Sequence, residues 1–166
     1  FMEARSRILE EINEKRSAVS QKQALVGLDG FVDLLMQPIR ERFGPGDDFN
    51  PMETITEFAE RIAGAAGKST NIEWAPMVQK IGGNGPIMSH SLVSFGMKVK
   101  YIGALGYPTV HPVFEEFAKK TEAVSIADPG ESHAAELTDG KIIFGSMASL
   151  DEVTFDRVID TMTEGL

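Results

Sequence analysis

The chain has 166 residues, of which 42% are hydrophobic and 25% are charged, and this suits one globular domain or part of a larger one. Its formal net charge of −9 argues against binding to nucleic acid or to an anionic membrane surface, because both attract clustered Lys and Arg. The absence of cysteine excludes disulfides, thiolate metal sites and cysteine nucleophiles.

The first half of the chain predicts helices alternating with strands. The N-terminal residues carry charges around an apolar stripe and lack the apolar core of a secretory signal, and no apolar run approaches the roughly 20 residues of a membrane helix. We therefore expect a cytoplasmic protein. The predicted elements are a helix over 2–19, a strand over 24–26 that resumes at 31–35, a loop over 43–51, and a helix from near Asn50, with Pro51 in its first turn, to Gly64 or Gly67.

The second half continues the alternation and adds a hairpin. Its predicted elements are an edge strand over 72–81, a helix over 85–95, a strand over 98–106, a helix over 112–120 capped by Thr109 or His111, a strand over 122–128, a hairpin over 132–145 with its turn at Asp139-Gly140, and a last helix starting at Ser149 or Asp151. This order favours an α/β fold with a parallel sheet between helices. The hairpin and the strand near Trp74 indicate a small second sheet.

Glycines dominate the turn Gly82-Gly83-Asn84-Gly85-Pro86, which lies between a predicted strand and a predicted helix. Such a turn lets backbone N–H groups point at a polar ligand, and Asn84 offers a donor and an acceptor to a hydroxyl group. The same residues also suit a tight turn with an Asn cap and no ligand. The spacing matches neither a dinucleotide fingerprint nor a P-loop. The local residues leave the binding turn and the structural turn as alternatives.

Two aspartates, Asp29 and Asp33, follow the first predicted strand. Ligands of open α/β sheets bind beyond the carboxyl ends of the strands, where a carboxylate can accept hydrogen bonds from the hydroxyl groups of a sugar. The pattern favours a turn with Gly30 as the role of Asp29, and leaves substrate binding and simple solvent exposure both open for Asp33.

Other chemistry-bearing residues show no site pattern. The three histidines, His90, His111 and His133, lack metal-ligand spacing, so no metal site is predicted. Ser89 and Ser91 lack the Gly-x-Ser-x-Gly elbow of hydrolases, so no catalytic serine is predicted.

In combination, these motifs resemble the N-terminal part of the ribokinase, or PfkB-type, carbohydrate kinase family, over about residues 23–160. Asp33 is the best match to the aspartate that binds substrate hydroxyls in that family, and residues 132–145 resemble the hairpin of its substrate lid. The chain differs by Ile87, where the family usually has Asn, and by Tyr107-Pro108-Thr109, where it usually has an acidic stretch. The residues in the register of the first family signature are Gly82-Gly83, Ser89, Gly96 and Gly106.

The resemblance implies a Rossmann-like three-layer α/β sandwich of the ribokinase type, incomplete at its C-terminus, with a small β lid. It treats residues 1–166 as the N-terminal part of one domain, with lid strands near 31–37, 72–81 and 132–145. The family's second signature, a Gly-Ala-Gly-Asp run that supplies the base and the anion hole, is not found in this sequence. The ATP pocket would lie in the same absent half.

The function implied by the resemblance is a sugar or nucleoside kinase that, at full length, transfers phosphate from ATP with Mg²⁺ to a substrate hydroxyl. The residues it assigns to substrate binding are Asp33, Gly82, Gly83, Asn84 and Asp29. No catalytic residue is expected among these 166 residues, so the chain alone is expected to be inactive. The resemblance also suggests a homodimer. The alternatives are a non-catalytic polyol-binding module and a structural or partner protein that retains the substrate half of the fold.

Overall fold

The computed structural model describes residues 2–163, which form two compact units. Of the described residues, the first unit comprises 2–31, 81–130 and 147–163, and the second comprises 32–80 and 131–146. No helix within the described residues is long and apolar enough to cross a membrane.

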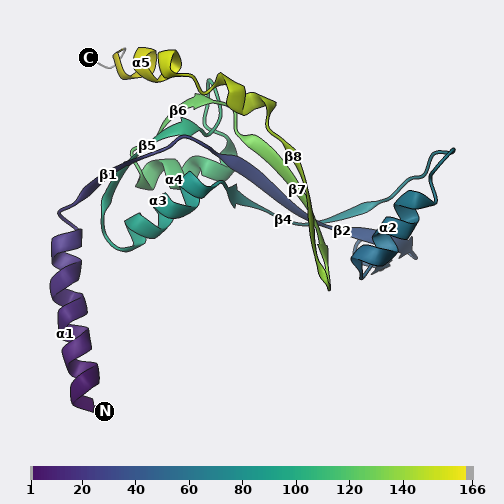
Figure 1. The fold of residues 1–166 in the computed structure, drawn as a ribbon, viewed down its shortest axis with the longest axis horizontal. Helices are drawn as coiled ribbons and strands as arrows, with labels where there is room; N and C mark the ends of the chain where they lie inside the picture. The colour runs from purple at the N-terminus through teal and green to yellow at the C-terminus, as the bar shows by residue number, and fades with distance from the viewer. Residues whose placement is uncertain (1, 164–166) are drawn as a thin grey trace. The chain divides into compact units, whose positions relative to one another are not determined.

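A parallel sheet forms the centre of the first unit (Figure 1). Its strand order is β1-β5-β6, with Val26 beside Tyr101 and Ala104 beside Ala127. The elements of this unit are α1 (Met2–Val19), β1 (Gln23–Val26), α3 (Asn84–Ser94), β5 (Lys98–Ala104), the 3₁₀ helix η1 (Pro112–Phe114), α4 (Glu115–Lys120), β6 (Val124–Ala127), the 3₁₀ helix η2 (Ala148–Glu152) and α5 (Phe155–Thr163).

Side chains alternate between the two faces of β5. Val99 and Tyr101 are buried, and the Tyr101 ring meets that of Phe117 on α4 edge-to-face with centroids 5.1 Å apart. Lys98 and Lys100 point to the opposite face, where they line a hollow together with residues of β1 and α5. The sheet therefore has helices on both faces, and the α/β three-layer arrangement predicted from the sequence is confirmed.

Arginine 157 attaches α5 to β6. Its guanidinium donates a hydrogen bond of 2.7 Å to the carbonyl of Ile126, forms an ion pair of 2.8 Å with Glu152, and stacks over the Tyr107 ring at 5.2 Å. The helix itself begins later than expected, because Thr154 rather than Ser149 or Asp151 caps it, accepting from the N–H of Arg157 at 3.3 Å. The hydroxyl of Ser149 instead donates to the carbonyl of Pro129.

The second unit is a β-sheet with one helix, and two of its strand pairs are antiparallel. Its strands follow the order β3-β2-β7-β8, and β4 also pairs with β2. These elements are β2 (Phe31–Arg42), β3 (Phe49–Pro51), α2 (Ile55–Ala63), β4 (Trp74–Gly82), β7 (Gly130–Leu137) and β8 (Gly140–Ser146). The hairpin of β7 and β8 turns after Leu137, which pairs with Gly140, so the hairpin predicted around Asp139-Gly140 is confirmed. Most of the residues expected in the lid lie in this unit.

Two boundaries in the second unit differ from the sequence predictions. Residues 49–51 form β3, where a loop was expected, because Pro51 and Phe49 pair with Ile39 and Arg42 of β2. The helix expected from Asn50 begins instead at Ile55, after Thr54, whose side chain accepts from the N–H of Glu57 at 3.2 Å. Proline 51 therefore belongs to a strand.

Candidate functional site

The glycine turn after β4 is held by Asp29. One carboxylate oxygen of Asp29 accepts from the N–H of Asn84 at 2.8 Å, and the other accepts from the N–H of Gly85 at 2.9 Å. These are the first two residues of α3, and the next residue, Pro86, has no N–H. The N–H of Ile87 bonds to the carbonyl of Gly83 at 3.2 Å. The N–H groups of Asn84 and Gly85, which a helix N-terminus usually leaves unpaired, are thus satisfied within the protein.

This arrangement decides what the turn presents to a ligand. The carboxylate at the α3 N-terminus is stabilised by the helix dipole, and it occupies the place that an anion would take. The backbone N–H groups of Asn84 and Gly85 are consequently not directed at a ligand. The side chain of Asn84 is exposed, and its amide remains the group on this turn that could meet a hydroxyl.

Two glycines of the turn have no room for a side chain. Gly83 has φ +92°, and a Cβ there would lie 2.9 Å from Asp29 Oδ2. A Cβ on Gly85 would lie 2.7 Å from both Asp29 Oδ1 and the Tyr101 hydroxyl oxygen. The glycines therefore allow the turn to approach Asp29 closely, which non-glycine residues could not do without strain.

Tyr101 supports the backbone of Asp29 through a hydrogen bond. Its ring is fully buried, and its hydroxyl donates to the backbone carbonyl of Asp29. Burial, with a smaller contribution from the Asp29 charge, raises the pKa of the Tyr101 hydroxyl above its ordinary value. The hydroxyl therefore stays protonated and keeps donating at neutral pH.

A small hollow lies beside Asp29. It has a volume of about 250 Å³ and is lined by Leu28, Asp29, Leu150 and Val153. The half-buried carboxylate of Asp29 is the polar group in this lining. Each carboxylate oxygen has more than one acceptor position, so Asp29 can accept from a further hydroxyl while it holds α3.

Asp33 lies in the second unit, on β2. Its carboxylate is half-buried, and its Oδ1 accepts a hydrogen bond of 2.6 Å from the hydroxyl of Ser132 on β7. Within the described residues Oδ2 has neither a hydrogen bond nor an ion pair. An ionised carboxylate with one oxygen fixed by the protein and the other available is suited to accept a hydrogen bond from a ligand hydroxyl.

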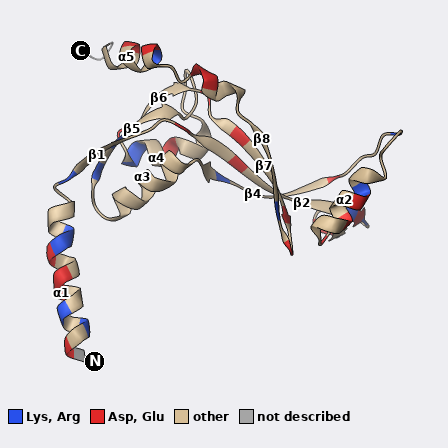
Figure 2. Cartoon of the chain, in the orientation of Figure 1, with Lys and Arg blue, Asp and Glu red and all other residues tan. Residues whose placement is uncertain are grey.

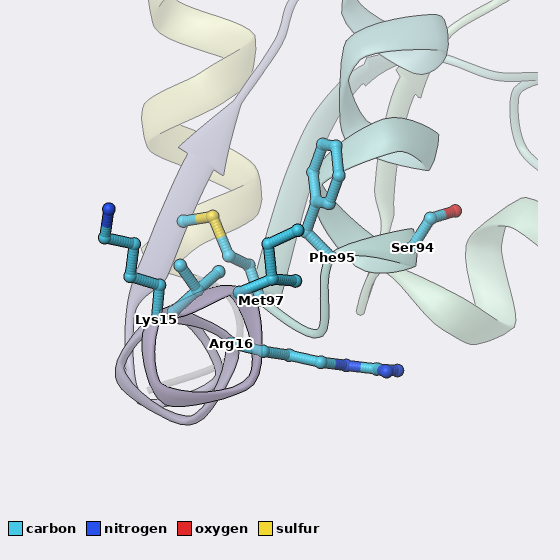
Figure 3. Close-up of a pocket in the computed structure, with 7 residues that line it drawn as sticks. Lys15, Arg16, Ser94, Phe95 and Met97 are labelled. Atoms are coloured by element: carbon cyan, nitrogen blue, oxygen red, sulfur yellow. The ribbon is translucent and has the colours of Figure 1, made fainter. Parts of the chain in front are cut away.

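A separate groove lies between α1 and the turn after α3 (Figure 3). It has a volume of about 540 Å³, and its lining residues are Ile12, Lys15, Arg16, Val19, Ser94, Phe95 and Met97. None of the residues predicted to bind substrate is among them. Lysines, arginines and acidic residues alternate along α1 (Figure 2), so the helix surface is charged around this groove.

The residues present do not fit a metal–nucleotide site. No group of His or acidic residues among residues 2–163 is arranged to hold a metal ion. The N–H groups of Asn84 and Gly85 bond to Asp29 and are not available to cradle a phosphate. His111, one of the candidates for a cap, accepts from the N–H of Val113 at 3.2 Å and thereby starts η1.

The structure brings some of the predicted site residues together. Asp29 meets Asn84 directly and contacts the turn at Gly83, and buried Gly82 ends the strand that leads into that turn. Asp33 belongs to the other unit. Two supporting residues were not predicted from the sequence: Tyr101 and Ser132 support Asp29 and Asp33 through single hydrogen bonds. The alternation of β7 could have placed Ser132 on a strand face, but not opposite Asp33.

Comparison with known families identifies the chain. The family described as prokaryotic ketohexokinase matches residues 3–165. The chain belongs to this family. The resemblance to carbohydrate kinases seen in the sequence is thereby confirmed, and the chain is assigned to a family of sugar kinases.

Individual proteins resemble the chain at low sequence identity. A ketohexokinase from Haloferax volcanii is 28% identical over 134 residues, which make up 78% of this chain and 35% of that protein. A solved structure described as a candidate sugar kinase from Clostridium perfringens has 14% identity and a TM-score of 0.49, covering 87% of this chain and 40% of its own. The ribokinase of Giardia lamblia has 15% identity and a TM-score of 0.49, covering 87% and 38%. The chain thus spans less than half of each of these proteins.

Proposed function

We propose that this chain is the sugar-binding part of a kinase that phosphorylates a hydroxyl of a ketohexose or a closely related sugar. The observation that carries the proposal is the family match over residues 3–165. The Asp33 carboxylate supports it, because one oxygen is fixed by Ser132 and the other is left to accept from a hydroxyl. Sugar recognition depends on such buried or half-buried acceptors in defined orientations.

The proposed roles follow from the contacts of each residue. Asp33 and the amide of Asn84 bind sugar hydroxyls. By family resemblance Gly82 and Gly83 are proposed to line the sugar site, and Asp29 holds the turn at Asn84 while it offers further acceptor positions to the sugar. These residues place the acceptor hydroxyl, and positioning is a large part of catalysis in phosphoryl transfer.

ATP is the proposed phosphate donor, with Mg²⁺ neutralising the phosphate charge during transfer. The residues that hold them, and the base that accepts the hydroxyl proton, are proposed to lie in a further part of the polypeptide. A Gly-Ala-Gly-Asp segment encoded after Leu166 would support this view of the whole protein. Because the reaction needs ATP, we place the protein in the cytoplasm, and by family resemblance we propose a homodimer.

The test is a kinase assay on the full-length protein with ketohexoses, aldoses and nucleosides. We expect ATP consumption with a ketohexose, and we expect Asp33→Ala to raise KM or lower kcat strongly. One lost hydrogen bond to a charged acceptor corresponds to about 1.5–3 kcal/mol, or roughly 10- to 150-fold in kcat/KM. An Asp33→Ala enzyme with unchanged kcat/KM would show that Asp33 does not bind the sugar.

A second assay uses the 166-residue chain alone. We expect it to consume no ATP with any of these sugars, because no residue described here is placed to hold the transferring phosphate. Sugar-dependent ATP turnover by this chain, with its intact mass verified, would contradict the proposal that the phosphate-binding residues lie in a further part of the polypeptide. Sugar binding without any turnover by the full-length protein would favour a non-catalytic polyol-binding protein.

A further inference from the structure

We propose that Ser132 is a positioning residue for sugar recognition, acting through Asp33. This inference rests on the proposed function of Asp33. The hydroxyl of Ser132 donates to Asp33 Oδ1 at 2.6 Å, a short distance typical of a hydrogen bond to a charged acceptor. Asp33 and Ser132 are 99 residues apart in the sequence, so this contact is created by the fold.

Both residues lie on strands whose neighbours restrict them. Asp33 follows buried Val32 on β2, and Ser132 precedes buried Ala134 by two residues on β7. The other edge of β7 pairs with β8, where Ser132 faces Gly145. The backbone of Ser132 is therefore held in a strand that lies between β2 and β8, and its side chain is directed by strand alternation.

The hydrogen bond selects one orientation of the Asp33 carboxylate. A free aspartate rotates about χ2 and presents either oxygen at many angles. With Oδ1 held by Ser132, Oδ2 is the oxygen left to accept from a ligand, and its direction is set before the ligand arrives. Preorganisation of this kind lowers the ordering cost of binding. Ser132 is expected to affect recognition of the one hydroxyl that Asp33 contacts.

The experiment compares Ser132→Val, Ser132→Thr and Asp33→Ala in the full-length protein. Valine and threonine have nearly the same shape and both suit a strand, but only threonine keeps the donor. The measured quantities are KM and kcat with D-fructose and with each of its monodeoxy analogues. Circular dichroism and the unfolding midpoint report whether each variant folds, and Ser132→Ala replaces the valine variant if that one does not.

We expect Ser132→Val to raise KM for D-fructose about fivefold, the equivalent of one ordinary hydrogen bond, with a smaller change in kcat. Ser132→Thr should stay within about twofold of the unmodified protein. The penalty of Ser132→Val should vanish on the same deoxy analogue for which Asp33→Ala loses its effect. A purely structural role would instead give the same penalty with every analogue.

The outcomes separate this inference from the proposed function. If Asp33→Ala impairs sugar use while Ser132→Val does not, the positioning role is wrong and the role of Asp33 stands. An equal Ser132→Val penalty on all analogues also overturns the positioning role. If Asp33→Ala leaves KM and kcat unchanged with every sugar, the proposed role of Asp33 fails and the inference about Ser132 fails with it.

Discussion

Removing the Asp29 side chain should destabilise the N-terminus of α3 and, with it, the folded protein. Asp29→Ala deletes both hydrogen bonds, at 2.8 and 2.9 Å, that satisfy Asn84 and Gly85. Hydrogen bonds to a charged acceptor contribute about 1.5–3 kcal/mol each, and N-cap replacements cost about 0.5–2 kcal/mol in total. Because Asp29 is partly exposed, solvent screening favours the lower values. We expect a loss of about 2–3 kcal/mol in the free energy of unfolding.

The assay is urea unfolding of the full-length protein, followed by circular dichroism, with a thermal scan alongside. Tm should fall as well, by about 2–4 °C per kcal/mol in a domain of 150–250 residues and by less in a longer polypeptide. Asp29→Asn, which keeps one acceptor oxygen, should lose about half as much. The control is Asp47→Ala, because the exposed Asp47 side chain makes no hydrogen bond or ion pair within the described residues. An Asp29→Ala midpoint equal to that of the control would refute the capping role.

Two further predictions concern the same turn. Gly83→Ala should lower the free energy of unfolding by about 1–3 kcal/mol, and clearly more than Gly46→Ala does. Both glycines have positive φ, but only Gly83 has Asp29 beside the position of the missing Cβ. Equal costs for the two substitutions would show that Asp29 does not crowd the turn. Tyr101→Phe should lose about 0.5–1.5 kcal/mol at neutral pH with the hydrogen bond to Asp29. Because the folded-state pKa of Tyr101 is raised, its protonated hydroxyl stabilises the fold fully below the ordinary tyrosine pKa, and that contribution falls as the pH rises above it. The gap between Tyr101→Phe and the unmodified protein should therefore narrow at pH values above about 10, and a gap that stays constant with pH would contradict this reasoning.

Much of the secondary structure was predictable because it depends on local patterns. The buried strand around Val26 and the hairpin at Asp139-Gly140 have distinct sequence signals, namely an apolar run and a turn dipeptide. The α2 boundary was missed because Pro51 near Asn50 suggested a helix start. The competing helix-start signal was Thr54 followed by Glu57, whose N–H the Thr54 side chain caps. This signal prevails because Phe49–Pro51 pairs with β2, which leaves Pro51 in a strand.

The candidate site was predictable in its members and not in its connections. Asp29, Asp33 and the glycine turn are visible as motifs. Which aspartate holds the turn depends on how β1 and α3 are placed by the sheet, and no local pattern specifies that. The support given by Tyr101 and Ser132 comes from residues 72 and 99 positions away from their acceptors, a separation that single-sequence patterns do not reach.

The dependence of α3 on Asp29 also has a consequence for the order of folding. The helix contains Gly85 and Pro86 in its first turn and has no side chain of its own at the cap, so its N-terminus has no local nucleus. Its first two N–H groups bond to the carboxylate of Asp29, which lies 55 and 56 positions earlier in the chain. The backbone carbonyl of Asp29 in turn accepts from the hydroxyl of Tyr101 on β5. Closing such long loops is slow compared with forming a helix turn. We therefore expect the glycine turn to reach its final geometry once β5 has paired with β1 and Tyr101 holds the backbone of Asp29, later than the helix turns that depend on local contacts alone.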